Sequence, residues 1–311
     1  MVIGIVRFAL DDKSTGNKLT MKIDKLAKAY RVDSGKHFRL KDYDPAECGG
    51  HSAKEHSAEA LQAGIVRTAE LQDMLYAQDQ WAVLLIFQAL DAAGKDGIIK
   101  HVMSGVNPQG CQVFSFKAPS DPELQHDFLW RTTNKLPERG HLGIFNRSYY
   151  EEVLVVRVHS AILKSQKTPP SLVTKNIWEE RFEDIRHFEQ HMARNGTVIR
   201  KFFLNLSKKE QKVRFLKRLE EPEKNWKFSA DDIHERAYWD DYQKAYEEMI
   251  ANTASGHAPW YVVPADNKWF TRLVVSAVLV ETLESLDLSY PKVDGAKRKE
   301  LGAAKKLLLK K

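Results

Sequence analysis

Five short apolar segments recur through the chain with helix-like segments between them. They are WAVLLIF (81–87), CQVFSF (111–116), HLGIFN (141–146), TVIRKFFLNL (197–206) and APWYVVPA (258–265). Apolar runs of this length are typical of strands buried on both faces, and their alternation with helices is typical of a parallel sheet. The sequence therefore predicts an α/β fold with a central, largely parallel five-stranded sheet and helices on both faces.

The segment after the first run has several features of a phosphate-binding loop. In the pattern G-x-x-x-x-G-K-[ST], Gly94 and Lys95 fit, whereas Ala89 stands at the first glycine and Asp96 at the Ser/Thr. A Gly-Lys pair alone is weak evidence. A strand, a turn and a helix N-terminus in this order, however, place backbone N–H groups where they can bind an anion. This context favours a phosphate cradle over a plain turn.

Asp91 lies inside the same loop. A carboxylate in an anion cradle repels phosphate unless a cation lies between them. If the loop is functional, Asp91 is therefore predicted to bind Mg²⁺ and to replace the missing hydroxyl ligand.

The third apolar run ends in Asn146 and Arg147, at the position where a phosphotransferase commonly has a metal-binding acid. Arg147 suits a bidentate contact to a transferring phosphoryl group. It suits equally well a structural role, either capping the following helix or pairing with Glu151 or Glu152. The residues alone leave both interpretations open.

Residues 207–227 form a basic segment with eight Lys or Arg residues against four Glu. Ser207 and Glu210 predict a capping box that opens a helix, and Pro222 ends it. A solvated helix face is the ordinary interpretation of such a segment, but its place before the last strand also suits a lid over phosphates. After that strand, Asp266 is predicted to cap the next helix.

Composition restricts the partners and the compartment. A formal net charge of +6 and a pI of about 9.0 favour anionic partners. Two cysteines are too few for a disulfide framework and indicate a reducing compartment. No segment approaches the roughly 20 apolar residues of a membrane span, so a cytoplasmic protein without a membrane partner is expected. The basic end, residues 297–311, is interpreted as a solvated terminal helix or a fraying end.

Together these motifs resemble the second family of polyphosphate kinases, the polyphosphate-dependent nucleotide phosphotransferases. The resemblance rests on ordered segments between residues 28 and 290, which are RVDSGKHFRLKDYDP, ALDAAGKDG, FLWRTTNKLPERGHLGIFNRSYYEEVLVVRVH, VRFLKRLEEPEKNWKFS and VPADNKWFTRL. It implies a thymidylate-kinase-like, three-layer P-loop kinase domain over 81–290. A helical and looped extension is expected at 1–80, a helical lid at about 207–235 and a basic tail at 291–311.

The resemblance also implies roles for single residues. Asp91, Lys95, Asn146 and Arg147 correspond to the catalytic centre, and Glu151 is expected to join Asp91 and Asn146 around Mg²⁺, with Mn²⁺ as an alternative ion. The expected phosphate and nucleotide contacts are Ala92, Ala93, Gly94, Asp96, Gly97, Lys100, Arg131, Arg214, Lys217, Arg218, Lys224 and Lys227. Asn146 stands where many members have Asp, and this departure resembles the subgroup that phosphorylates AMP as well as ADP.

The implied activity is transfer of the terminal phosphoryl group of inorganic polyphosphate to nucleoside mono- and diphosphates, AMP to ADP and ADP to ATP. A homo-oligomer, dimer or tetramer, is also implied. The alternatives are a polyphosphate kinase that prefers ADP and an ATP-dependent nucleoside monophosphate kinase. A nucleic-acid binder would explain the basic charge but not Asp91 inside a phosphate loop, so nucleic acid is not an expected partner.

Overall fold

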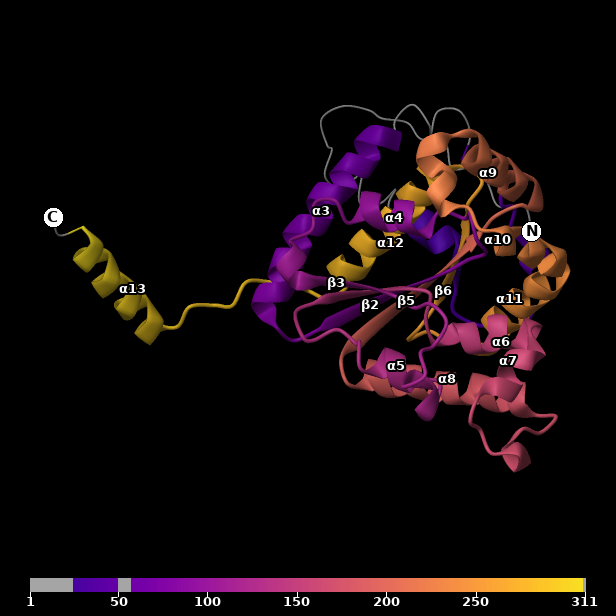
Figure 1. Cartoon of the computed structure of the whole chain (residues 1–311). Coiled ribbons are helices and arrows are strands. Elements are labelled where there is room, and N and C mark those ends of the chain that lie inside the picture. Colours follow the sequence, from indigo (N-terminus) through magenta and orange to yellow (C-terminus); the bar gives the residue numbers. More distant parts are fainter. Residues whose placement is uncertain (1–24, 50–56, 310–311) are drawn as a thin grey trace.

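The computed structural model describes residues 25–49 and 57–309, and its centre is one six-stranded sheet (Figure 1). The strands lie in the order β1-β6-β5-β2-β4-β3. Their bounds are β1 Arg31–Val32, β2 Ala82–Gln88, β3 Cys111–Ser115, β4 Leu142–Asn146, β5 Thr197–Asn205 and β6 Trp260–Pro264. The five predicted strands are all present and mutually parallel, which confirms the predicted fold class.

The prediction of five strands was one short. β1 pairs antiparallel with β6, with Arg31 opposite Tyr261 and Val32 opposite Trp260. A two-residue strand inside an irregular polar segment gives no periodic signal, so the sequence could not reveal it. The N-terminal extension thus supplies a strand to the core sheet. Residues 1–24 and 50–56 of that extension lie outside the described residues.

Helices cover both faces of the sheet. Their bounds are α3 Ser57–Gln78, α4 Lys95–Val102, α5 Trp130–Thr133, α6 Val155–Val158, α7 Ser160–Ser165, α8 Ile177–Arg194, α9 Lys208–Glu220, α10 Ala230–Glu235, α11 Trp239–Thr253, α12 Lys268–Glu284 and α13 Gly295–Leu308. Among these, α3, α4 and α12 pack on one face, while α8 and α11 pack on the other. A short 3-10 helix, η4 (Tyr149–Val153), lies beside α8 and α11.

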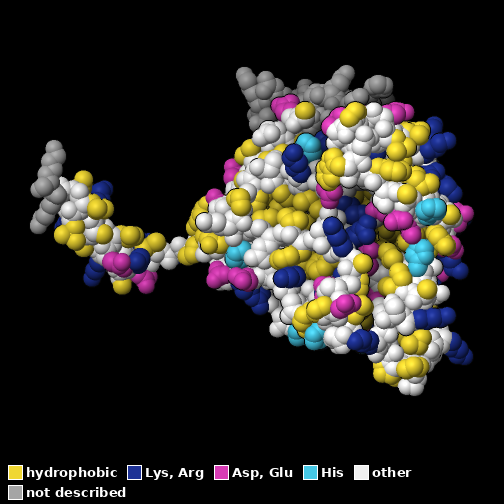
Figure 2. All heavy atoms as spheres, viewed as in Figure 1, with side chains coloured by type: hydrophobic (Ala, Val, Ile, Leu, Met, Phe, Trp, Pro, Cys, Tyr) yellow, Lys and Arg dark blue, Asp and Glu magenta, His cyan; other side chains and the backbone are white. Residues whose placement is uncertain are grey.

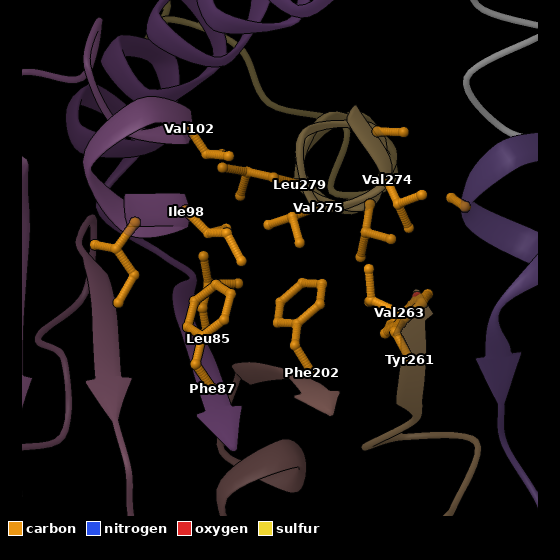
Figure 3. Close-up of a cluster of buried hydrophobic side chains, with 14 of the residues drawn as sticks. Leu85, Phe87, Ile98, Val102, Phe202, Tyr261, Val263, Val274, Val275 and Leu279 are labelled. Atoms are coloured by element: carbon orange, nitrogen blue, oxygen red, sulfur yellow. The ribbon is translucent and has the colours of Figure 1, made fainter. Parts of the chain in front are cut away.

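The first face is held by a continuous apolar cluster (Figure 3). Phe87 of β2 and Phe202 of β5 stack with their ring centroids 4.8 Å apart. Ile98 of α4 and Val275 of α12 point down onto these rings (Figure 3). Because α12 lies between the sheet and α3, it is apolar on nearly all sides, as a helix buried all round must be.

The second face contains a fully buried polar network. Lys201 of β5 donates to Glu189 Oε2 of α8 at 2.7 Å, to the Tyr150 hydroxyl at 3.0 Å and to the Thr253 carbonyl at 2.8 Å. The Tyr149 and Tyr150 hydroxyls both donate to Glu189 Oε1, at 2.9 and 2.7 Å. Burial lowers the pKa of Lys201, and Glu189 opposes that shift. The network therefore ties η4 to α8, α11 and the sheet.

The C-terminal helix α13 stands away from the rest of the molecule (Figure 1). None of its residues is buried, in keeping with the solvated terminal helix that the sequence suggested. Within the described part of the chain, no helix is long and apolar enough to span a bilayer.

Lys201→Met should lower the free energy of unfolding by about 3–5 kcal/mol, because it removes one partner of a fully buried ion pair and leaves Glu189 without its cation. The double variant Lys201→Met/Glu189→Met should recover part of this loss. Equilibrium urea unfolding measures both, with the exposed Lys164→Met on α7 as the control. A Lys201→Met protein as stable as the control would contradict this account of the network.

Candidate active site

The loop between β2 and α4 curls around the ammonium group of Lys95. Ala92 and Gly94 adopt positive φ angles of 66° and 100°. The Lys95 ammonium is buried and donates to the Ala89 carbonyl at 2.8 Å. Burial lowers the pKa of Lys95, and the nearby Arg147 lowers it further. Positive φ angles followed by a helix N-terminus are features that anion-binding loops share, and phosphate binding by this loop stays a prediction.

Arg147 is held against this loop. Its backbone has φ 66° and its N–H donates to the Phe87 carbonyl at 3.0 Å. Its guanidinium donates to Asp91 Oδ1 at 2.8 Å and lies 3.8 Å from Glu151 Oε2. Burial acts against the charge on Arg147, but Glu151 and Asp91 outweigh it and raise its pKa. The sequence left Glu151 and Glu152 open as partners of Arg147, and the structure places Glu151 beside it.

Glu152 points the other way and pairs with Arg181 Nε of α8 at 3.1 Å, while Gln166 donates to it at 2.7 Å. Glu151 is largely enclosed, with 17% of its side chain exposed, and desolvation raises its pKa against the pull of Arg147 and Lys95. In the amide orientation that satisfies both of its polar atoms, Gln88 donates to Glu151 Oε1 at 2.8 Å. Nothing local in the sequence marked Gln88 or Arg181 as part of this site.

Asn146 contacts the other acid of the loop. Its Nδ2 donates to Asp96 Oδ1 at 2.6 Å, and its Oδ1 is buried with no hydrogen-bond partner among the described residues. A buried amide oxygen without a partner, in a site that also contains carboxylates, is the kind of oxygen ligand that Mg²⁺ prefers. Groups of three or more acidic, His or Cys ligands are absent from the described residues.

Arg214 of α9 fastens the loop to the end of β6. It is 6% exposed, and its two terminal nitrogens donate to the carbonyls of Ala92, Ala93, Ala265 and Asp266 at 2.6–3.1 Å. Its Nε donates to Glu210 at 2.9 Å. A phosphate contact by Arg214 stays a prediction. In the structure these hydrogen bonds hold the loop after β2 against the end of β6.

The start of α9 differs in part from the predicted capping box. The Ser207 hydroxyl accepts from the Glu210 N–H at 3.0 Å, as expected, but the Glu210 carboxylate turns to Arg214. The Ser207 N–H instead donates to Asp266 Oδ1 at 2.8 Å. Asp266 as the cap of α12 was wrong: Asn267 occupies that position, and the Asp266 carboxylate serves the N-terminus of α9.

The other cations of residues 207–235, the segment predicted to form a lid, have varied surroundings. Lys217 is exposed, and Lys224 pairs with Glu221. Arg218 pairs with Asp232 of α10 at 2.9 Å. The side chain of Lys227 lies outside the described part of the chain. Figure 2 shows basic and acidic side chains meeting in a hollow of the molecule below α9.

Two cavities meet at Arg147 and Glu151, which line both. The larger has a volume of about 700 Å³, and Arg131 of α5 is in its wall. The Arg131 guanidinium donates a hydrogen bond to the Lys117 carbonyl at 2.6 Å, which holds it in place. The smaller cavity, of about 120 Å³, lies over Asp91. Of the remaining predicted residues, Gly97 and Lys100 lie on α4, and Lys100 is exposed.

A parallel sheet with a lysine-bearing loop at its carboxyl edge, an arginine directly after the adjacent strand and a basic helix beside them defines a P-loop kinase-like phosphotransferase. The comparisons with known proteins give the family. The model of the family "Polyphosphate kinase 2" matches residues 51–291. The chain belongs to the polyphosphate kinase 2 family, as its motifs suggested.

The relatives cover nearly the whole chain. An "ADP-polyphosphate phosphotransferase" of Rhodopseudomonas palustris is 57% identical over 91% of this chain and 98% of its own length. An "AMP/ADP-polyphosphate phosphotransferase" of Meiothermus ruber is 45% identical over 88% of this chain and 98% of its own. The crystal structure of polyphosphate kinase 2 from Arthrobacter aurescens matches with a TM-score of 0.81 at 41% identity, over 90% of this chain and 96% of that one.

Arg214→Lys should lower the free energy of unfolding in the absence of nucleotide and polyphosphate. An ammonium cannot reproduce the planar fork that reaches four carbonyls, and hydrogen bonds to a charged group contribute about 1.5–3 kcal/mol each. Denaturant unfolding measures the loss, with the exposed Lys217→Ala on the same helix as control. If both variants match the wild type, Arg214 does not hold the loop.

Proposed function

We propose that this protein is a polyphosphate:AMP/ADP phosphotransferase, which transfers the terminal phosphoryl group of inorganic polyphosphate to nucleoside mono- and diphosphates. The observation that carries the proposal is the position of Arg147, between two cavities and 2.8 Å from an acid of the phosphate loop. Family membership and the names of the relatives from R. palustris and M. ruber support polyphosphate as the donor.

The chain's own residues would act mainly by binding and neutralising phosphate. The loop N–H groups and Lys95 suit the donor phosphates, and Arg147 suits the phosphoryl group in transfer. No general base is needed, because the attacking oxygen of AMP or ADP is already ionised. Catalysis then rests on positioning and on preorganised cations.

The two cavities suggest where each substrate binds. We assign the acceptor nucleotide to the larger one, because its volume suits a small molecule and Arg131, Arg147 and Arg181 line it. Polyphosphate would reach the loop along the exposed cations of α9, where Lys208, Lys209, Lys212 and Lys217 face solvent. A polyanionic donor gives these lysines a role that a single nucleotide would not.

Asp91 and the free Oδ1 of Asn146 would hold Mg²⁺, whose charge offsets that of the phosphate oxygens. Glu151 would act on the ion only at a distance, since it is occupied by Gln88 and Arg147. Mn²⁺ accepts the same oxygen ligands and is the alternative ion.

The relatives carry two acceptor names, ADP and AMP/ADP. We include AMP because Asn146 is neutral, so it repels an incoming α-phosphate less than Asp would. The test is to incubate the purified protein with polyphosphate, Mg²⁺ and AMP and to follow ADP and ATP. Turnover only when ADP is supplied would restrict the enzyme to diphosphates, and turnover with ATP but not polyphosphate would overturn the donor.

The cellular setting is also part of the proposal. Cys48 and Cys111 are free thiols, which suits the reducing cytoplasm where nucleotides are abundant. A homo-oligomer, dimer or tetramer, is expected by family resemblance, and sedimentation velocity measures it.

Asp91→Asn should reduce kcat by on the order of 10²-fold or more, because it removes the charge that makes a cation favourable in the loop. Stability should change little, because Asp91 is about one-third exposed and exposed ion pairs contribute little to folding. Steady-state rates with ADP and a thermal melt measure the two effects. Asp73→Asn, an exposed substitution on α3, is the matched control. A folded Asp91→Asn protein with near-normal turnover would contradict the assignment.

A further inference from the structure

Asp96 and Asn146 form a pair that the phosphate-loop pattern does not explain. Asp96 stands in the first turn of α4, where that pattern has Ser or Thr, and Asn146 is the last residue of β4. Asn146 Nδ2 donates to Asp96 Oδ1 at 2.6 Å across fifty positions of sequence. Asn146 is 8% exposed, so its amide is fixed by this contact and by packing.

The contact decides which atom Asn146 presents to the active site. An ionised carboxylate only accepts hydrogen bonds, so the amide nitrogen must face Asp96. The amide oxygen then points away from Asp96, and this is the buried oxygen that has no partner among the described residues. Without Asp96, the amide could turn over and present its N–H₂ group instead.

We propose that Asp96 is a positioning residue, which orients the Asn146 amide so that its oxygen faces the reacting phosphates. The inference rests on the proposed function for the role of that oxygen. It gives Asp96 a task other than direct phosphate contact. It also makes positions 96 and 146 one unit, which needs one carboxylate and one amide.

The unit restricts what position 146 can hold. Asn146→Asp alone would place two carboxylates at the 2.6 Å contact, where both cannot be ionised at low cost. Exchanging the two residues, as Asp96→Asn/Asn146→Asp, keeps one carboxylate and one amide. It again leaves one oxygen of residue 146 free to face the site.

The test compares four proteins: the wild type, Asp96→Asn, Asn146→Asp and the exchanged double variant. Their melting temperatures are measured in EDTA without nucleotide or polyphosphate, so that this readout is independent of activity and metal. Asn146→Asp should melt lower by about 5 °C, and the double variant should regain at least half of the difference. The double-variant cycle removes the effect of Asp96 on the dipole of α4, which the Asp96→Asn change also contains.

Kinetics form the second readout. Asn146→Asp should lower kcat/KM by on the order of tenfold or more, and the exchanged variant should recover most of it. The ratio of kcat/KM for AMP to that for ADP is then compared between the wild type and the exchanged variant. This comparison gives the effect of a charge at position 146 on acceptor choice, without repulsion between two carboxylates.

One outcome is that the changes in melting temperature and in log(kcat/KM) caused by the two single substitutions simply add up to those of the double variant. That result would show that residues 96 and 146 are not coupled, and it would contradict the proposal. Coupled melting temperatures in a protein inactive with polyphosphate would support the Asp96–Asn146 contact and reject the proposed function. Proteins that are active with polyphosphate but show no coupling would support the proposed function and reject the Asp96–Asn146 contact. The two ideas therefore fail separately.

Discussion

The parallel pairing of β2 between β4 and β5 is the constraint on which the site depends. Its register places Phe87 of β2 opposite Asn146 of β4 and opposite Phe202 of β5. Because parallel strands share one carboxyl edge, the loop after β2 and the turn after β4 must emerge side by side. The Arg147 N–H continues this pairing by donating to the Phe87 carbonyl. A shift of one residue would turn Asn146 to the opposite face.

Both cations at the centre of the site are bound by groups of the chain itself. Lys95 meets the Ala89 carbonyl, and Arg147 meets Asp91 and Glu151. A phosphate bound as proposed would compete with these contacts, so its binding free energy would be reduced by what they contribute. The same contacts would hold the cations in place, and preorganised charge stabilises a transition state better than charge that must first reorganise. The Lys201–Glu189 network helps to fix the position of Arg147, because it holds η4, the turn that carries Glu151.

The sequence revealed those features that depend on neighbouring residues. Apolar runs identified the five parallel strands, and a Gly-Lys pair after a strand identified the loop. It could not reveal features that depend on distant contacts. Asp266 was assigned to the nearest helix start, α12, but the fold brings the N-terminus of α9 closer. Arg214 was expected to contact phosphate from a basic helix, and no local pattern shows that two loops converge on its side chain.

The two unusual acids of the loop have one explanation when the end of β4 is considered with them. Asp91 pairs with Arg147, and Asp96 pairs with Asn146, so two loop acids meet two consecutive residues of the neighbouring strand end. Restoring a hydroxyl at position 96 would therefore not rebuild an ordinary nucleotide loop. It would remove the carboxylate that accepts from the Asn146 amide, and a hydrogen bond to a charged group contributes about 1.5–3 kcal/mol. Asp96 in place of Ser/Thr and Asn146 in place of Asp are therefore best understood as one paired feature of the structure.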